Sequence, residues 1–152
     1  MKDISCLMAV AYLLLATSAL AEGKCSSRTI HARYGVTCQG SVSTSPGVPL
    51  APYALMTTCT GNANAFFKCT GTQSFDGTVV PSVAQGPASV NSDCTGKITF
   101  DRGTPQELDF NFLILHDGEE IRGMLQNPGS AVQCDLIRMS DLEHAVNDLE
   151  PK

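Results

Sequence analysis

Short apolar or alternating stretches, separated by turn-forming residues, repeat along the chain from Thr29 onward. Gly, Pro, Asn, Asp and Ser interrupt these stretches about every ten residues, a spacing typical of all-β sandwiches and barrels. The pattern predicts one small antiparallel β-barrel of about eight strands. The expected strands are His31–Val42, Ala54–Gly61, Ala65–Thr72, Gly77–Val83, Gly96–Asp101, Leu108–Leu115, Glu120–Leu125 and Ala131–Met139. Two stretches rich in Pro, Gly and Ser, Ser45–Pro52 and Pro81–Asn91, are predicted to be loops.

The segment Phe110–Leu125 predicts its own register, because Asp117-Gly118 suits a two-residue turn that needs positive φ. Counting outward from that turn gives one apolar face, on which the facing pairs are Ile114 with Ile121, Phe112 with Gly123, and Phe110 with Leu125. The other face carries Asn111, Leu113, Leu115, Glu120, Arg122 and Met124. Gly123 either leaves room for the Phe112 ring or marks a bend in the sheet.

The N-terminus has the features of a removable secretion signal. Lys2 precedes an apolar run from Leu7 to Leu15, and Ala19-Leu20-Ala21 is a small-x-small cleavage pattern. The run is shorter than the ~20 residues that a membrane-spanning helix needs. We therefore expect a signal peptide over residues 1–21, cleaved before Glu22, and a single domain over 22–152 secreted to the extracellular space or the periplasm.

After the last expected strand, Ser140 and Glu143 have the spacing of a helix capping box. Apolar residues then recur at helical intervals, at Leu142, Ala145, Val146 and Leu149. The pattern predicts a short C-terminal helix over 140–150 whose apolar stripe docks on the barrel rather than on a partner.

The cysteines of the expected mature domain are Cys25, Cys38, Cys59, Cys69, Cys94 and Cys134, and Cys6 lies in the leader. An even number of thiols in a secreted chain predicts disulfides, and six cysteines allow fifteen pairings. Cys59 and Cys69 flank a predicted hairpin loop, so we pair them. If the first and last strands meet, Cys38 faces Cys134, which leaves Cys25 for Cys94. The scattered spacing contains no C-x-x-C pair that would begin a zinc site.

Composition argues against several classes of partner. The chain has 10 Lys and Arg against 15 Asp and Glu, a formal net charge of −5, and no basic run that would track phosphates. Trp is absent, which removes the best stacking platform for bases or sugars. We expect no nucleic-acid partner, no cofactor and no metal site. The pattern does not fix the oligomeric state.

Several segments resemble a widespread group of small secreted proteins over most of the mature chain. They include Tyr34-Gly-Val-Thr-Cys38, Val90-Asn-Ser-Asp-Cys-Thr-Gly96, and Glu120-Ile-Arg122 followed by Asn127-Pro-Gly129 and Arg138-Met139. The group looks like a calycin-type or allene-oxide-cyclase-like barrel, whose members carry apolar small molecules or guide cyclisation inside a cavity. The resemblance implies a fold, and because one fold hosts many functions it assigns no catalytic residue.

The candidate ligand-binding residues are Tyr34, Asn111, Glu120, Arg122 and Met124. Glu120 and Arg122 lie two apart on one strand face, where they either reach a common ligand group from inside a cavity or form an exposed ion pair of about 0–1 kcal/mol. Tyr34 and Asn111 are either polar handles in a barrel mouth or ordinary strand residues. His31, His116 and His144 lie near no Ser or Cys in a nucleophile arrangement.

Three functions fit these observations. The first is a secreted binding protein that holds a small hydrophobic molecule in an apolar interior. The second is a cofactor-free isomerase or cyclase, which needs a buried polar group with a shifted pKa, for which His31, Glu120 and Tyr34 are candidates. The third is a secreted protein that contacts a host or neighbouring cell through its surface loops. A filled interior would exclude the first.

Overall fold

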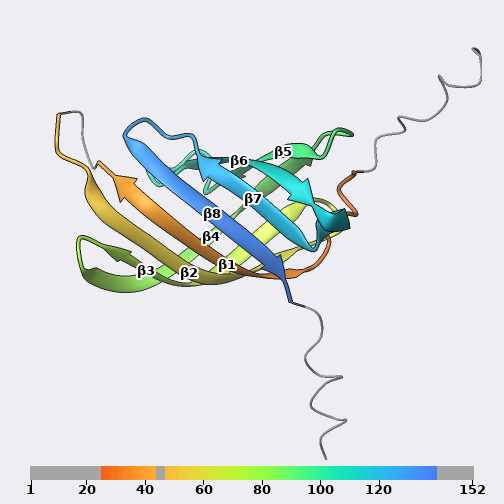
Figure 1. Ribbon diagram of the computed structural model, residues 1–152, viewed down its shortest axis with the longest axis horizontal. Coiled ribbons are helices and arrows are strands. Elements are labelled where there is room, and N and C mark those ends of the chain that lie inside the picture. Colours follow the sequence, from red (N-terminus) through yellow and green to blue (C-terminus); the bar gives the residue numbers. More distant parts are fainter. Residues whose placement is uncertain (1–24, 44–46, 140–152) are drawn as a thin grey trace, which may run out of the picture.

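The computed structural model describes residues 25–43 and 47–139. Their strands form one closed antiparallel barrel in which each strand neighbours the next in sequence and β8 pairs with β1 (Figure 1). The strands are β1 (Arg33–Val42), β2 (Ala51–Gly61), β3 (Phe66–Phe75), β4 (Thr78–Val90), β5 (Thr95–Phe100), β6 (Leu108–Leu115), β7 (Glu120–Leu125) and β8 (Ser130–Arg138). The predicted all-β barrel of eight strands is confirmed. The predicted signal peptide and the predicted helix over 140–150 lie outside the described residues.

Strand β4 is longer than the sequence pattern indicated. It continues to Val90 through the stretch Pro81–Asn91 that we expected to be a loop. Strand β5 pairs with β4 only at Ala88–Val90, so the earlier part of β4 has a ladder on one side only. A strand with one free side tolerates proline, which lacks the N–H that a second ladder would use.

The predicted register of the β6–β7 hairpin is confirmed at all three facing pairs. The ladder ends at Leu115 and Glu120, and a one-turn 3₁₀ segment, η1 (His116–Gly118), connects the strands. Asp117 and Gly118 have φ of 55° and 93°, the positive values that the turn chemistry required. The apolar face of the hairpin points into the barrel, where Phe110, Phe112, Ile114 and Ile121 are buried.

The end of the barrel at which β1 begins is closed by the N-terminal segment 25–32 (Figure 1, right). Ile30 of this segment is fully buried, and the Gly61 N–H donates a hydrogen bond to the Ala32 carbonyl. The segment also lies so close to the β6–β7 connection that a Cβ at Gly118 would stand 2.3 Å from the Thr29 carbonyl oxygen. Segment 25–32 therefore closes this end of the barrel, and we call it the floor.

Three disulfides join the barrel, with the pairing that the strand order predicted. Cys38–Cys134 crosses the seam between β1 and β8, and Cys59–Cys69 joins β2 to β3. Cys25–Cys94 ties the floor segment to the β4–β5 connection. Bridges of this number and span are consistent with an oxidising compartment.

Candidate ligand-binding cavity

The barrel interior is not completely filled. A cavity of about 80 Å³ lies between its walls. Most of its lining is apolar, and all eight strands contribute to it. The apolar lining residues include Val36, Leu55, Ile98, Phe110, Leu125 and Leu136. These side chains point inward because alternate residues of a strand face opposite sides of a sheet, and the closure of the barrel puts one side of every strand in the interior.

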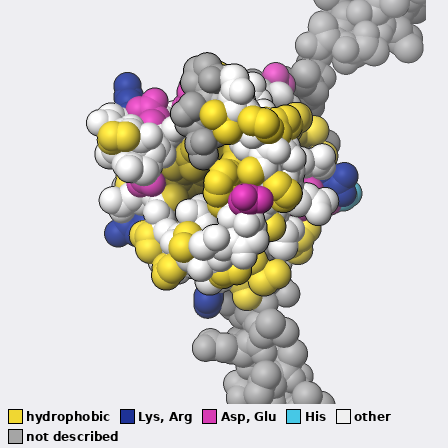
Figure 2. All heavy atoms as spheres, turned by 90° about the vertical axis from the view of Figure 1, so that its left-hand side faces the viewer, with side chains coloured by type: hydrophobic (Ala, Val, Ile, Leu, Met, Phe, Trp, Pro, Cys, Tyr) yellow, Lys and Arg dark blue, Asp and Glu magenta, His cyan; other side chains and the backbone are white. Residues whose placement is uncertain are grey.

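A second hollow of about 230 Å³ lies at the end of the barrel opposite the floor. It is bordered by Val42 of β1 and by the β7–β8 connection, Asn127–Gly129. Tyr53, Gln73, Leu108 and Leu125 line both this hollow and the inner cavity, so the two adjoin. Figure 2 looks onto this end and shows hydrophobic side chains within the hollow. We call this hollow the mouth.

Four residues with polar side chains line the cavity, and all four come from one wall, strands β2, β3 and β4. They are Tyr53, Thr57, Gln73 and Ser82. The Tyr53 hydroxyl donates a hydrogen bond to Gln73 Oε1 at 3.3 Å. Burial raises the pKa of the Tyr53 phenol above its ordinary value of 10.0, so the group is a neutral donor at physiological pH.

Tyr34 is fully buried, but at the floor of the barrel and not beside the cavity. Its hydroxyl donates a hydrogen bond to the Gly118 carbonyl at 3.1 Å, and its ring lies 6.2 Å from that of Phe67. Burial raises its pKa above 10.0, with the Arg138 charge acting in the opposite direction. We expected Tyr34 in the mouth of the barrel. It lies instead at the floor, where its contacts join β1 to the β6–β7 connection and to Phe67.

Asn111, Glu120, Arg122 and Met124 lie on the outer face of β6 and β7, opposite the buried face of the hairpin. Arg122 Nε donates a hydrogen bond to Glu120 Oε1 and lies 3.6 Å from Asp135 Oδ1 on β8. The hydrogen bond from Arg122 and the charge of Glu120 raise the pKa of the Arg122 guanidinium. The expectation that this face borders a cavity is corrected. The two residues form an ion pair on the outer face, in which Arg122 is exposed and the Glu120 side chain is only 16% exposed, because the more apolar face of the hairpin turned inward.

No known protein family, curated protein or solved structure matches this chain.

The histidines of the described chain contribute nothing to the cavity. His31 is exposed beside the floor, and His116 is exposed with its Nδ1 3.5 Å from Glu120 Oε2. His144 lies outside the described residues. Within residues 25–43 and 47–139, no cluster of His, Cys, Asp and Glu side chains is placed to hold a metal ion, and no helix has the length and apolarity to cross a membrane.

Three of the polar residues that line the cavity were not proposed as ligand-binding residues, because they fall near the edges of the expected strands. Gln73 follows the expected end of the third strand, Ser82 sits in the stretch assigned to a loop, and Tyr53 precedes the expected start of the second strand. One signal was present. Tyr53 and Leu55 alternate with Ala54 and Met56, which are exposed, and this alternation begins before the predicted start of the strand.

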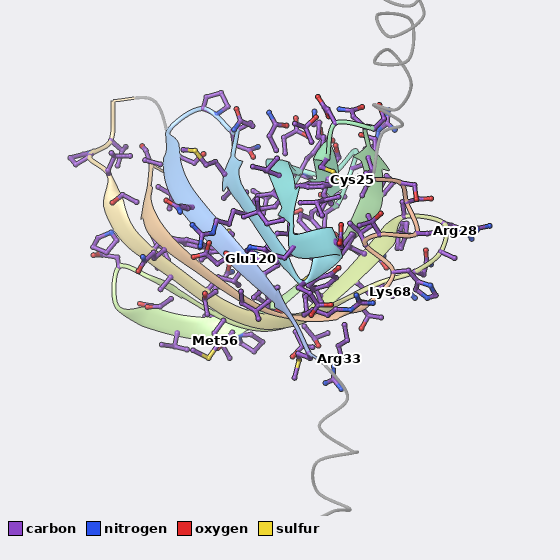
Figure 3. All side chains as sticks on the ribbon, turned by 45° about the vertical axis from the view of Figure 1, so that its right-hand side comes forward. Cys25, Arg28, Arg33, Met56, Lys68 and Glu120 are labelled. Atoms are coloured by element: carbon purple, nitrogen blue, oxygen red, sulfur yellow. A yellow bond between two sulfur atoms is a disulfide. The ribbon has the colours of Figure 1, made fainter. Side chains whose placement is uncertain are left out.

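The outer face of strands β2 to β4 differs from the charged outer face of β6 to β8. Met56 is 69% exposed, and Val79 and Val83 are 67% and 74% exposed. Figure 3 shows Met56 projecting from the outer surface of the barrel. The cross-strand partners of Met56 on this face are Thr37 and Thr72, which carry no charge.

Proposed function

We propose that the protein is secreted and binds a small hydrophobic molecule in the open end of its barrel. The observation that carries this proposal is the apolar cavity that adjoins the mouth, inside a barrel whose other end is closed. Apolar surface removed from water contributes roughly 25 cal/mol per Å² to binding. The few polar groups of one wall would orient the molecule, as in other small-molecule sites.

The volumes limit the size of the molecule. The inner cavity of about 80 Å³ is smaller than the roughly 150 Å³ engineered protein cavity that binds benzene. The inner cavity therefore suits a short aliphatic or branched group, and the rest of the molecule would occupy the mouth of about 230 Å³. A long-chain lipid does not fit this space without a change in the barrel.

The calycin-type or allene-oxide-cyclase-like kinship and the secretion signal belong to this proposal. The up-and-down order of the strands and the one closed end support the kinship. The three disulfides support secretion.

The cyclase alternative has less support. Its chemistry needs a titratable group at the cavity, but Tyr34 lies at the floor and His31 and Glu120 lie on the outside. The only titratable side chain among the described residues that line the cavity is the phenol of Tyr53, which is neutral at physiological pH. Contact with a cell through surface loops stays a prediction from the sequence.

Binding of the neutral fluorophore 1-aminoanthracene tests the proposal. We expect saturable binding with enhanced emission. Ala84→Leu adds volume to a residue that lines the cavity, so it should weaken binding by about ten-fold or more. Val83→Leu on the same strand points outward and is the matched control, for which affinity should be unchanged.

A thermal melt of both variants separates a blocked cavity from an unfolded barrel. Absence of saturable binding by the wild-type protein, or equal loss of affinity in the two folded variants, contradicts the proposal.

A further inference from the structure

The first observation concerns charge inside the binding space. No Lys, Arg, His, Asp or Glu is among the described residues that line the cavity or the mouth. An ionised group placed there would lose water without gaining a counter-charge, which is strongly unfavourable. The lining therefore selects against both carboxylates and ammonium groups.

The second observation concerns the connections around the mouth. Asp76 lies in the β3–β4 connection, and Asp101 and Glu107 lie in the β5–β6 connection. Arg102 is the one cation in these two connections. The rim is therefore net negative, which further disfavours the approach of an anion such as a fatty acid carboxylate.

The third observation is the unused hydrogen-bonding capacity of Gln73. Its Oε1 accepts the bond from Tyr53, and its Nε2 has no partner among the described residues. If the amide is turned, the Tyr53 hydroxyl becomes the free donor and the amide keeps one spare N–H. Both arrangements leave at least two donors between the cavity and the mouth, since Gln73 and Tyr53 line both.

We propose that the molecule bound by this barrel is electrically neutral and carries a hydrogen-bond acceptor, a carbonyl or ether oxygen, that Gln73 and Tyr53 bind while its apolar part lies against β6 to β8. The inference rests on the proposed function and specifies the ligand class. Its apolar contacts would be the opposite wall of the cavity, which includes Phe110, Leu125 and Leu136.

Displacement of 1-aminoanthracene by three matched C7 compounds at pH 7 tests the inference. 2-Heptanone is neutral and has an acceptor, heptanoate is an anion and heptylamine is a cation. We expect 2-heptanone to displace the fluorophore, and each ion to need a concentration at least about ten-fold higher. Equal potency of heptanoate or heptylamine overturns the assignment of a neutral ligand.

Substitution of Gln73 tests the acceptor. Gln73→Leu combined with Tyr53→Phe removes the donors at nearly constant volume, and should weaken the binding of 2-heptanone by about three- to ten-fold. Gln133→Leu makes the same glutamine-to-leucine change on the outer face of β8 and should have no effect. Unchanged affinity in the double variant overturns the role of the donors.

Gln73→Lys provides a gain of function. A cation at this position would give a carboxylate its missing partner, so heptanoate should become the better of the C7 ligands. Failure of heptanoate to gain in a folded Gln73→Lys variant overturns the electrostatic explanation.

The two proposals fail in different ways. If 1-aminoanthracene binds and is sensitive to Ala84→Leu but none of the three C7 compounds displaces it, the ligand class is overturned and the cavity function stands. If the fluorophore itself does not bind, both are overturned.

Discussion

The Tyr34 hydroxyl donates a hydrogen bond to the Gly118 carbonyl oxygen at 3.1 Å, across 84 positions of sequence. This contact joins β1 to the β6–β7 connection. Together with Ile30 and the Cys25–Cys94 bridge, it makes the end of the barrel that faces away from the mouth. The floor therefore closes one end of the barrel, and the mouth lies at the other end.

Tyr34→Phe should destabilise the protein by about 1 kcal/mol, because the buried Gly118 carbonyl loses its donor while the ring packing is kept. Urea unfolding measures the loss. Tyr53→Phe removes a hydroxyl of the same kind from the partly exposed mouth, and should cost less. Equal losses of unfolding free energy in the two variants would show that the Tyr34–Gly118 hydrogen bond stabilises the protein no more than the Tyr53–Gln73 hydrogen bond does.

Gly96→Ala should destabilise the barrel by about 1–3 kcal/mol, the typical cost of overpacking a core. A Cβ at position 96 would stand 2.2 Å from the Phe112 ring. Gly35→Ala is the control, because a Cβ there has no neighbour nearer than 3.9 Å. If both variants unfold at the same urea concentration, the close packing of the ring on Gly96 is not a constraint on the fold.

The Cys38–Cys134 bridge should stabilise the protein more than Cys59–Cys69 does. The two bridges close stretches of 96 and 10 positions, and loop-closure entropy then predicts a difference of about 2 kcal/mol. Double Cys→Ala variants, each lacking one bridge, can be compared by urea unfolding. A variant without Cys59–Cys69 that is the less stable of the two would contradict this entropic ranking.

Asp109 should make the barrel more stable above about pH 4 than below it. Hydrogen bonds from Lys97 and Thr99 hold the pKa of its carboxyl below the ordinary value of 3.8. The folded state therefore binds this proton less readily than the unfolded chain. The contribution is present above the unfolded pKa and is lost as the pH falls through the folded pKa.

An NMR titration of the Asp109 carboxyl carbon follows this effect directly. Lys97→Met removes the largest cause, so the pKa of Asp109 should rise toward its ordinary value. An unchanged titration curve would show that Lys97 does not lower the pKa of Asp109.

The sequence predicted the architecture better than the site, for physical reasons. The β6–β7 register followed from the turn chemistry of Asp117-Gly118, and the disulfides followed from strand order, because both are local or topological constraints. The positions of the Phe110 and Phe112 rings depend instead on packing between strands. The Phe110 ring lies over Gly123, and the Phe112 ring lies over Gly96 on the neighbouring strand, rather than over Gly123 as we considered.

The cavity depended on where several strands end relative to one another. Gln73 lines the cavity because β3 runs past Thr72, the predicted end of the strand. The choice of inward face also misled us. Leu113 and Met124 indicated a cavity wall, yet they are exposed, and their face carries the Glu120–Arg122 ion pair on the outside of the barrel.

The most direct measurement of the central claim is a methyl NMR titration with 2-heptanone, which reports on both sides of the barrel wall at once. Inward methyl groups of Leu55, Leu125 and Leu136 line the cavity, and outward methyl groups of Val83, Leu113 and Ile137 are exposed. We expect saturable shifts confined to the inward group. Shifts confined to the outward group, or no saturable shift at all, would contradict it.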